Sequence, residues 1–503
     1  MSLISVNNLT FGYDGSLKNI FENVSFNIDT DWKLGLIGRN GKGKTTFLKL
    51  LLGKYEYQGA ISKNVEFDYF PFEVKNKERM AIEIVNEIAP NVEDWEIIRE
   101  LNLLNTDTEV LYRSFNLLSG GEQIKILLIS LFLKGNNFLL IDEPTNHLDI
   151  ETRNNLVNYL EKKKGFILVS HDRNFLDKVV NHIISINNTN IEIQQGNFSS
   201  WKENKNRQDN FEKIQNERLQ KDINRLEIAS KNCAKWSNEA EKTKNKKYNS
   251  ETTIDKGYIG HKADKMMKKS KVMEQRIEKA INEKTNLLKN IEVNDTLKII
   301  PLKSNKNPLI FAHNLQIKYS KETIFNPITF EVNNGDRVAL IGKNGIGKSS
   351  ILKLILGEEL QYNGEFMVAN DLKISYVSQS TEDLKGNLRT FAYDNKINES
   401  IFKAMLVKMG LSQFDFDTNI QDMSEGQKKK VLIAKSISEQ ANIYIWDEPL
   451  NYIDILTREQ IEDAILNYNP TIIFVEHDEK FIEKVATKII KRATNYNFIV
   501  IDL

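Results

Sequence analysis

The stretch "GRNGKGKTT" at residues 38–46 occurs a second time in the chain, as "GKNGIGKSS" at residues 342–350. Both copies fit the pattern G-x-x-x-x-G-K-[ST], in which glycines let backbone N–H groups close round phosphate oxygens. In the first copy a short apolar run, "WKLGLIG", leads into the glycines, and a helical pattern, "TTFLKLLLG", follows them. The sequence therefore predicts two phosphate-binding loops, each for ATP or GTP.

Two further motifs repeat with almost the same spacing. "FLLIDEPTNHLD" at 138–149 recurs as "IYIWDEPLNYID" at 443–454, and "LVSHD" at 168–172 recurs as "FVEHD" at 474–478. The copies lie 304 residues apart at the loop lysine, 305 at the aspartate and 306 at the histidine. Such near-constant offsets indicate a duplicated domain.

The predicted fold class is α/β, with two tandem nucleotide-binding domains joined by a long α-helical hairpin. The domains are expected at residues 1–200 and 301–503, because β-rich apolar runs alternate there with helical patterns. Residues 201–300 form the linker, in which apolar residues recur at helical spacing and two glycines interrupt the pattern. The turn of the hairpin is expected within 241–260, where Asn, Ser, Thr and Gly gather.

Composition restricts the class of protein. Hydrophobic residues make up 40% of the 503 and charged residues 27%, which fits a soluble globular chain of two or three domains. The longest apolar run, residues 126–133, is too short to span a bilayer, and the N-terminus lacks the features of a secretory signal. The single cysteine, Cys233, excludes an internal disulfide framework and suits a reducing cytosol, so a cytoplasmic location is expected.

Charge is distributed unevenly, although the chain carries 69 basic and 69 acidic residues. Residues 201–290 hold 23 Lys/Arg against 14 Asp/Glu, and residues 231–271 alone hold 12 lysines against five acids. A basic segment between acidic domains suggests contact with a nucleic acid or a membrane surface; the alternative is a solvated helix with spare lysines. The tip of the hairpin, as the predicted RNA contact, comprises Lys244, Lys246, Lys247, Tyr248 and Asn249.

The chemistry of phosphoryl transfer assigns roles to the repeated motifs. Lys44 and Lys348 reach the β/γ-phosphates, and the hydroxyl groups of Thr45 and Ser349 bind Mg²⁺. The acidic pair that ends each apolar strand supplies an aspartate for Mg²⁺ and a glutamate that orients or polarises the attacking water. A histidine follows the next strand and is interpreted as a γ-phosphate sensor; the alternative is a structural histidine. The predicted catalytic residues are Glu143, Glu448, His171 and His477.

These motifs together resemble the ABC ATPase superfamily. "LSGGEQ" at 118–123 looks like its signature, "DEPTNHLD" at 142–149 like its Walker B and D-loop, and "SHD" at 170–172 like its switch. The resemblance implies that ATP is the nucleotide and that the two domains pair head to tail within one monomer. Each ATP would then lie between one domain's P-loop and the other domain's signature. Tyr13 and Tyr319 match the aromatic that stacks on adenine; the alternative is ordinary strand aromatics.

By this resemblance, the residues expected to contact ATP are Tyr13, Gly38, Asn40, Gly41, Gly43, Lys44, Thr45, Thr46, Ser119, Gly120, Gly121, Glu122, Tyr319, Gly342, Asn344, Gly345, Gly347, Lys348, Ser349, Ser350, Gln379, Ser424, Glu425, Gly426 and Gln427. The expected Mg²⁺ ligands are Thr45, Asp142, Ser349, Gln379 and Asp447.

Two departures from the family pattern fall on the first composite site. Phe72 stands where a Q-loop glutamine is expected, whereas Gln379 fits that position in the second domain. Glu425 replaces a signature glycine, where a carboxylate risks repulsion of the γ-phosphate unless it points away or meets a lysine among residues 428–430. We therefore expect both sites to bind ATP and the first to hydrolyse it more slowly.

Tandem domains with "EPTNHLD" and a basic helical linker resemble the ABC-F family of translation factors. The linker stretch "GYIGHKADKMMKKSK" at 257–271 and the lack of a long C-terminal extension resemble its antibiotic-resistance branch, of the Lsa/Vga type. The resemblance implies binding of the ATP-bound form to the E site of the bacterial 70S ribosome. The linker would approach 23S rRNA at the peptidyl-transferase centre and P-site tRNA, and displace lincosamides, streptogramin A and pleuromutilins.

Three alternatives stay open at this point. The first is a housekeeping ABC-F factor that relieves stalled ribosomes. The second is the duplicated ATPase subunit of a membrane transporter, against which the basic helical insert argues. The third is a DNA-bound ABC protein, which usually needs zinc-binding cysteines or far longer coils. In addition, Phe72 to Ser119 spans 47 positions and Gln379 to Ser424 spans 45, so no long arm is expected in the first domain.

Overall fold

The computed structural model describes most of the chain. The described residues are 3–13, 19–135, 137–146, 148–187, 190–244, 265, 268, 271–273, 275–280, 296–319, 322–323, 326–492 and 498–502. The chain divides into two compact units. One comprises Met1–Trp201 with Asn294–Leu503, and the other comprises Lys202–Val293.

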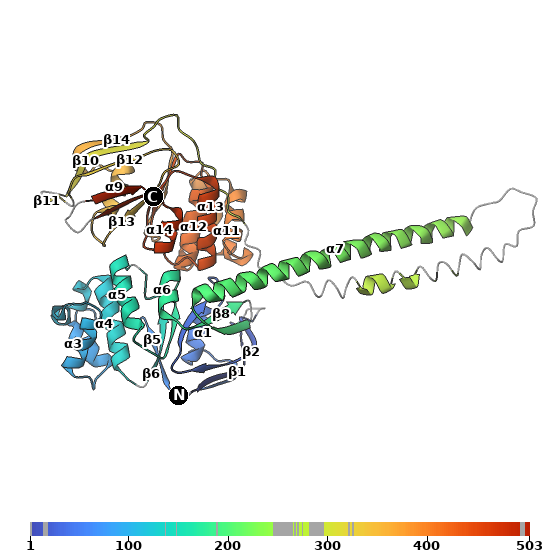
Figure 1. The fold of residues 1–503 in the computed structure, drawn as a ribbon, viewed down its shortest axis with the longest axis horizontal. Helices are drawn as coiled ribbons and strands as arrows, with labels where there is room; N and C mark the ends of the chain where they lie inside the picture. Colours follow the sequence, from blue (N-terminus) through green and yellow to red (C-terminus); the bar gives the residue numbers. More distant parts are fainter. Residues whose placement is uncertain are drawn as a thin grey trace, which may run out of the picture. The chain divides into compact units, whose positions relative to one another are not determined.

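The first ATPase domain combines two sheets with a helical part (Figure 1). Its strands are β1 (Leu3–Phe11), β2 (Phe21–Asp29), β3 (Lys33–Ile37), β4 (Gln58–Ser62), β5 (Glu66–Phe70), β6 (Asn137–Asp142), β7 (Phe166–Val169), β8 (His182–Asn187) and β9 (Asn190–Gln195). Its helices are α1 (Lys44–Leu51), α2 (Ala81–Ile88), α3 (Asp94–Leu103), α4 (Gly120–Leu133), α5 (Ile150–Leu160) and α6 (Arg173–Val179), with short 3₁₀ turns at Thr108–Tyr112 and Phe115–Leu117.

The second ATPase domain repeats this arrangement. Its strands are β10 (Ile310–Tyr319), β11 (Glu322–Thr323), β12 (Ile328–Val332), β13 (Arg337–Ile341), β14 (Gln361–Val368), β15 (Ile374–Val377), β16 (Ile443–Asp447), β17 (Ile472–Val475), β18 (Lys488–Arg492) and β19 (Phe498–Asp502). Its helices are α9 (Lys348–Ile355), α10 (Leu388–Asp394), α11 (Glu399–Lys408), α12 (Glu425–Ser438), α13 (Ile455–Tyr468) and α14 (Glu479–Val485), with 3₁₀ turns at Gln413–Asp417 and Ile420–Asp422. The prediction of two tandem α/β domains is confirmed.

Each domain has a six-stranded sheet whose order brings the motifs together. The orders are β5-β6-β7-β3-β8-β9 and β15-β16-β17-β13-β18-β19, with all pairs parallel except the last. Strands β6, β7 and β3 are therefore neighbours, and their carboxyl ends meet at one edge, as in other open α/β sheets. The phosphate-binding loop follows β3, the acidic pair ends β6 and the histidine follows β7. Strands β13, β16 and β17 repeat this in the second domain.

Burial explains why these strands read as unbroken apolar runs. All four residues of β7 and all five of β16 are buried, because helices and the smaller antiparallel sheet cover both faces. Helix α4 is apolar nearly all round, and its residues 125–131 are buried between the sheet and the neighbouring helices α2 and α3. The strands thus place polar residues only at their ends, where the motifs begin.

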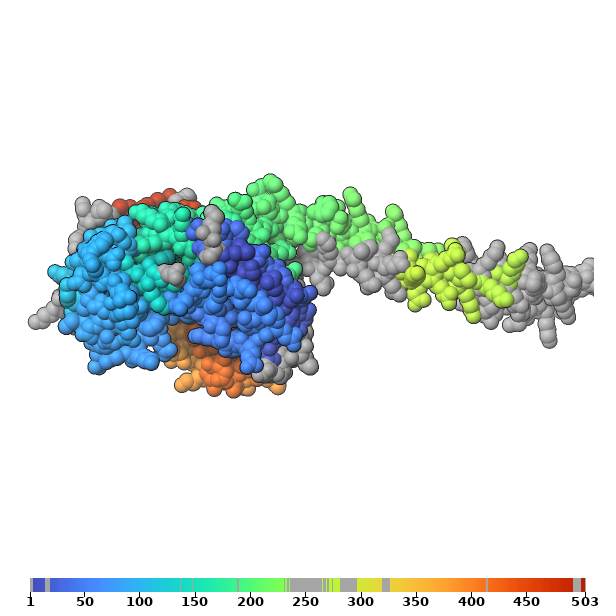
Figure 2. Space-filling model, turned by 90° about the horizontal axis from the view of Figure 1, so that it is seen from below, coloured from blue at the N-terminus to red at the C-terminus, as the bar shows by residue number. Residues whose placement is uncertain are grey.

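Lys202–Val293 forms its own unit. Helix α7 (Phe198–Lys244) has 47 residues, about 70 Å of helix at ~1.5 Å per residue. Within the unit, a groove is lined from α7 by Leu226 and from residues 265–280 by Met273 and Ile277, so two helical stretches share apolar surface. Figure 2 shows one face of α7 as uncovered surface over much of its length.

Among the described residues, no helix combines the length and the apolar character that crossing a membrane requires. The predicted tip falls almost wholly outside the described residues. Lys244 is the last residue of α7, while Lys246, Lys247, Tyr248 and Asn249 lie outside them.

Candidate functional site

Both phosphate-binding loops end in a glycine that starts a helix. Gly43 precedes α1 with φ of 94°, and Gly347 precedes α9 with φ of 97°, a left-handed conformation that favours glycine. A Cβ at Gly43 would also lie 2.5 Å from Ile20 Cγ2. The following lysines are buried: Lys44 Nζ donates to the Gly38 carbonyl at 2.7 Å, and Lys348 Nζ donates to the equivalent carbonyl of its own loop at 2.6 Å. Each loop thus holds a cation beside the free N–H groups of a helix start, which suits phosphate.

The residues predicted to bind magnesium meet in pairs. Thr45 Oγ1 donates to Asp142 Oδ2 at 3.1 Å, and Ser349 Oγ donates to Asp447 Oδ2 at 3.2 Å. Asp447 Oδ1 is buried without a hydrogen-bond partner among the described residues. A hydroxyl and a carboxylate side by side, with a carboxylate oxygen unused, fit a Mg²⁺ ion that takes its remaining ligands from phosphate and water.

Gln379 lies two residues beyond the end of β15, the strand that pairs with β16, and is exposed. Phe72 occupies the same position after β5, with 37% of its surface exposed. Tyr69 is an additional neighbour that the motifs did not indicate, because its hydroxyl donates to Asp142 Oδ2 at 2.9 Å. Burial raises the pKa of Asp142, while the bonds from Tyr69 and Thr45 oppose that shift.

The two predicted catalytic glutamates share an uncommon backbone conformation. Glu143 has φ of 50° and Glu448 has φ of 47°, and a non-glycine residue with positive φ is a mark of functional strain. Glu143 Oε1 lies 3.2 Å from His171 Nε2, and Glu448 Oε1 lies 3.8 Å from His477 Nε2. The sheet therefore brings each predicted water-orienting carboxylate to its predicted sensor histidine.

Burial favours the uncharged forms of Glu143 and of both histidines. Burial, together with the charge of Asp142, raises the pKa of Glu143 to about 8. Burial lowers the pKa of His477 to about 3 and that of His171 well below its ordinary value. Both histidines are thus uncharged at neutral pH, and the described residues provide no hydrogen-bond partner for either ring nitrogen of His477. A neutral ring with an unused nitrogen can accept or donate one hydrogen bond to a phosphate or a water.

The signature motifs act as helix caps. Ser119 caps α4 by accepting from the Glu122 N–H, and Glu122 Oε2 accepts from the Ser119 N–H at 2.8 Å. Ser424 and Gln427 repeat this capping box at α12. The S-x-x-E/Q spacing of the motif is therefore also a helix-start signal, which sequence reasoning did not use.

Each phosphate-binding loop contacts the opposite domain. Asn40 Nδ2 donates to the Tyr452 carbonyl at 2.7 Å, and a Cβ at Gly426 would lie 2.6 Å from Asn40 Nδ2. At the other site, Lys343 Nζ lies 2.6 Å from Glu151 Oε2 on α5. Signature residues Gly120 and Gly121 have no such close contact with the opposite loop. A side chain at Gly426 would therefore meet the opposite loop, whereas one at Gly120 or Gly121 would not.

Glu425 meets a lysine, as the sequence suggested. Its Oε1 lies 3.0 Å from Lys428 Nζ, and its Oε2 accepts from Thr381 Oγ1 at 2.5 Å. These two bonds keep the pKa of Glu425 below its ordinary value although partial burial opposes them. The other two lysines of the run are buried elsewhere: Lys430 pairs with Asp454 at 2.7 Å, and Lys429 turns to backbone carbonyls.

Tyr13 lies beside the first loop. Its hydroxyl is 2.9 Å from Thr46 Oγ1, and its ring packs edge-on against Phe11 and Tyr55. With 44% of its surface exposed, the ring retains an open side that can stack on a base. Tyr319 ends β10, and its side chain lies outside the described part.

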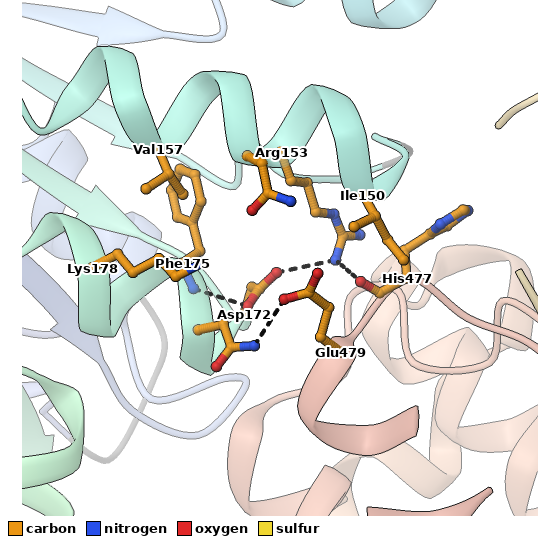
Figure 3. Close-up of a pocket in the computed structure, with 10 residues that line it drawn as sticks. Ile150, Arg153, Val157, Asp172, Phe175, Lys178, His477 and Glu479 are labelled. Carbon is orange, nitrogen blue, oxygen red and sulfur yellow. Dashed lines mark hydrogen bonds and ion pairs between the residues drawn. The ribbon is translucent and has the colours of Figure 1, made fainter. Parts of the chain in front are cut away.

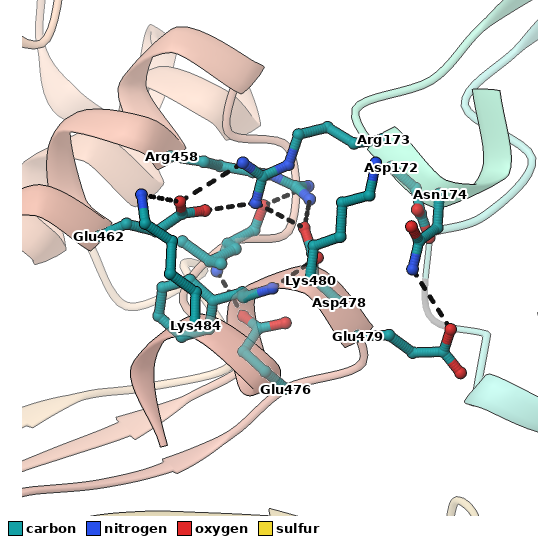
Figure 4. Close-up of polar contacts among 12 residues, drawn as sticks. Asp172, Arg173, Asn174, Arg458, Glu462, Glu476, Asp478, Glu479, Lys480 and Lys484 are labelled. Atoms are coloured by element: carbon teal, nitrogen blue, oxygen red, sulfur yellow. Dashed lines mark hydrogen bonds and ion pairs between the residues drawn. The ribbon is translucent and has the colours of Figure 1, made fainter. Parts of the chain in front are cut away.

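A buried ion cluster joins the domains behind the sites (Figure 4). Arg173 of α6 pairs with Glu462 of α13 across the two domains, and Glu462 is 0% exposed. Lys484 Nζ lies 3.1 Å from the same carboxylate, and Arg458 NH1 lies 2.9 Å from Asp478 Oδ2. Asp478 ends the motif "FVEHD", but Arg173, Glu462, Arg458 and Lys484 lie outside the repeated motifs, so the sequence did not indicate the cluster.

The position of the first domain that is equivalent to Glu462 has a different residue and different neighbours (Figure 3). Val157 stands where the second domain has Glu462, and it lines a small pocket with Arg153 and Glu479. Arg153 donates to Asp172 at 3.1 Å and to the His477 carbonyl at 3.0 Å. The cross-domain contact here is therefore polar but lacks the buried carboxylate at its centre.

The described residues hold no cluster of three or more His, Cys, Asp or Glu side chains that would suit a metal ion by themselves. A magnesium ion at either site would thus depend on nucleotide phosphates for part of its ligand shell.

Comparison with known proteins places these features in a family. The model of the ABC transporter family matches residues 21–146 and 325–451. The chain is 30% identical to the ATP-binding protein Uup of Buchnera aphidicola subsp. Acyrthosiphon pisum, over 97% of this chain and 80% of that protein. It is 28% identical to the ribosome protection protein VmlR of Bacillus subtilis, over 94% of this chain and 84% of that protein.

Among solved structures, the archaeal ribosome recycling factor aABCE1, crystallised with the archaeal ribosomal stalk protein aP1, has a similar fold. The TM-score is 0.64 at 19% sequence identity, and the alignment covers 98% of this chain and 89% of the other. At this identity the likeness concerns the fold alone.

Proposed function

Because this chain belongs to the ABC-F family of ATPases, we propose that its ATP-bound form binds the E site of the bacterial 70S ribosome and protects the peptidyl-transferase centre. The chain itself is an ATPase with two ABC domains that bind ATP. In the proposed action, the basic linker approaches 23S rRNA and P-site tRNA and displaces lincosamide, streptogramin A and pleuromutilin antibiotics.

One observation carries this proposal: the chain is similar to a ribosome protection protein over 94% of its own length, which includes the linker as well as both ATPase domains. The linker adds a physical argument, since residues 231–271 hold 12 lysines and five acids and would neutralise RNA phosphates. A lysine-rich tip suits phosphate better than a small uncharged drug. We therefore place displacement in a rearrangement of RNA and tRNA rather than in direct contact with the drug.

The ATPase sites supply the switch. Lys44 and Lys348 would hold the β/γ-phosphates, and the hydroxyl–carboxylate pairs at Asp142 and Asp447 would hold Mg²⁺. A bound Mg²⁺ neutralises charge on the phosphates during transfer. Glu143 and Glu448 orient or polarise the attacking water, while the neutral histidines hold the γ-phosphate side of each site. ATP binding closes the two domains, and hydrolysis allows them to open.

Sedimentation tests the ribosomal target. The Glu143→Gln/Glu448→Gln double variant, which binds ATP without cleaving it, should sediment with 70S ribosomes in ATP and not in ADP. The matched control is the same variant with Lys44→Ala and Lys348→Ala, which should stay in the supernatant. Sedimentation that is equal in ATP and ADP, or absent in both, would contradict the proposal.

Drug susceptibility then separates resistance from a housekeeping role. Expression in a sensitive host should raise the inhibitory concentration of at least one of the three drug classes. Removal of residues 245–249 should abolish this protection while ribosome binding persists. Ribosome binding without any protection by the intact chain would favour the housekeeping factor, and co-purification with a membrane permease would favour the transporter subunit.

A further inference from the structure

Two charged side chains are buried in the second ATPase site at positions where the first site has neutral ones. Lys429 is the fifth residue after the N-cap Ser424 of α12, and Ile124 is the fifth after the N-cap Ser119 of α4. Glu476 directly precedes His477, and Ser170 directly precedes the first histidine. Lys429 is 2% exposed and Glu476 is 3% exposed, so both charges are removed from water.

Lys429 links two catalytic segments through their backbones. Its Nζ donates to the Ser378 carbonyl at 2.9 Å and to the Glu448 carbonyl at 3.2 Å. Ser378 precedes Gln379, the predicted magnesium ligand after β15, and Glu448 is the predicted water-orienting residue after β16. One ammonium group therefore ties the Gln379 loop to the end of the neighbouring strand.

Glu476 links two further segments. Its Oε1 accepts from the Leu450 N–H at 2.7 Å, and its Oε2 accepts from the His477 N–H at 3.0 Å. Leu450 lies two residues beyond Glu448, so this carboxylate joins the loop after β16 to the histidine after β17. Together the two side chains contact the backbone of all three catalytic segments of the second site.

The charge of Glu476 favours the charged form of Lys429. Burial lowers the pKa of Lys429, and the charge of Glu476 is the largest of the influences that oppose this shift, followed by those of Glu448, Asp447 and Glu425. Burial raises the pKa of Glu476 to about 7, which the positive Arg458 counteracts. A buried charge that lacks its counter-charge is costly, so the loss of Glu476 leaves Lys429 in a less favourable state.

In the first site, the two equivalent positions are occupied by the uncharged residues Ser170 and Ile124. Ser170 Oγ lies 3.1 Å from Thr145 Oγ1 and accepts from the Asp172 N–H at 3.1 Å. Ile124 packs against the apolar core of the first domain. Neither side chain has a hydrogen-bonding group that reaches both a Q-loop position and the catalytic glutamate.

We infer that Lys429 and Glu476 are positioning residues that hold Gln379, Glu448 and His477 in a fixed arrangement. We call this pair of buried side chains the brace, and among the two sites only the second has it. The inference concerns ATP cleavage by the chain itself, so it holds whatever the chain binds. Charge-assisted bonds to three backbone segments restrict their relative motion, and the rate of water attack depends steeply on such positioning. The brace thus makes the second site the faster hydrolytic site.

The test isolates the second site in the full-length protein by the background substitution Glu143→Gln. Single-turnover cleavage of pre-bound ATP and equilibrium binding of ATP are measured separately, without ribosomes. Lys429→Ile should slow cleavage about 100-fold and change ATP affinity less than about threefold, because the brace acts on positioning. Lys429→Arg, which can donate to both carbonyls, should retain cleavage within about tenfold of the parent.

Two further variants keep the result interpretable. Lys429→Ile/Glu476→Ser introduces the neutral pair of the first domain, removes both buried charges together, and should fold yet cleave slowly. Lys435→Ile removes a lysine from the same helix that pairs with Glu439 near the surface, and should cleave at the parent rate. Parent-rate cleavage by the folded double variant would overturn the inference. So would equal slowing by Lys435→Ile, or a loss of ATP affinity with unchanged cleavage.

Discussion

In the first ATPase domain the neutral side chains of Ile124 and Ser170 stand at two positions where the second domain has a buried lysine, Lys429, and a buried glutamate, Glu476. The Q-loop position differs in the same direction, with Phe72 in the first domain and Gln379 in the second. A duplicated fold thus carries two sites of unequal chemistry. The comparison teaches that two copies of one motif set can be supported by different buried side chains, so the two sites need not cleave ATP at equal rates.

The largest expected effect concerns the two glutamates. Glu448→Gln should lower steady-state ATP turnover by about 10²- to 10³-fold, since it removes the water-orienting carboxylate from the better organised site. Glu143→Gln should cost less, because we expect the first site to contribute the smaller share of turnover. Phosphate release at saturating ATP measures both variants, and a larger loss from Glu143→Gln would reverse the assignment of the faster site.

The next effect concerns the cross-domain ion cluster. Glu462→Val, which places there the residue that the first domain has at Val157, leaves Arg173 and Lys484 without their shared carboxylate. Removal of one partner from a buried ion pair costs about 3–5 kcal/mol. Urea unfolding of the nucleotide-free protein should register a loss of this size.

The matched control for this variant is Asn174→Ala, which removes only the 3.3 Å cross-domain bond from Asn174, the residue after Arg173, to Glu479. This bond is partly exposed, and its loss should cost no more than about 1 kcal/mol. Equal destabilisation by the two variants would show that the buried cluster contributes nothing beyond an ordinary polar contact.

A pH-dependent contribution to stability follows from Glu476. Burial raises the pKa of this carboxyl from its ordinary value of 4.5 to about 7 in the folded protein. Between these values the folded chain holds a proton that the unfolded chain has released, so stability falls as pH rises, by up to about 3 kcal/mol. Melting temperatures of the nucleotide-free protein at pH 5.5 and 8 should differ less for Glu476→Gln than for the parent. An unchanged difference would show that Glu476 is not the responsible group.

The smallest effect is expected from Glu425→Gly. Lys428 and Thr381 already engage this half-exposed carboxylate, and an exposed ion pair contributes below about 1 kcal/mol. Restoring glycine should therefore change single-turnover cleavage at the first site, measured in the Glu448→Gln background, by less than about fivefold. A larger rise would identify Glu425, rather than Phe72, as the main cause of slow hydrolysis there.

The amino-acid sequence was sufficient to predict the fold class and to identify the chemical groups of both sites. A G-x-x-x-x-G-K-[ST] loop works through its own backbone, and an acidic pair after an apolar run needs only the parallel sheet to bring it to the loop. The sequence also predicted the duplication, from the repeated motifs, and the ATPase activity, from the residues within them. It predicted a lysine partner for Glu425 because Lys428 lies one helical turn away.

Other features were settled by packing alone. The run "KKK" at residues 428–430 gives three adjacent lysines, yet one pairs with Glu425, one with Asp454 and one with two carbonyls, because helix α12 turns each to a different face. In the sequence, Glu476 is only a glutamate at the position of Ser170 in the first copy. In the fold, its carboxylate accepts hydrogen bonds from two backbone N–H groups. Long-range contacts of single side chains leave no periodic trace in a sequence, so they become visible only when the sheet and the second domain bring their partners within reach.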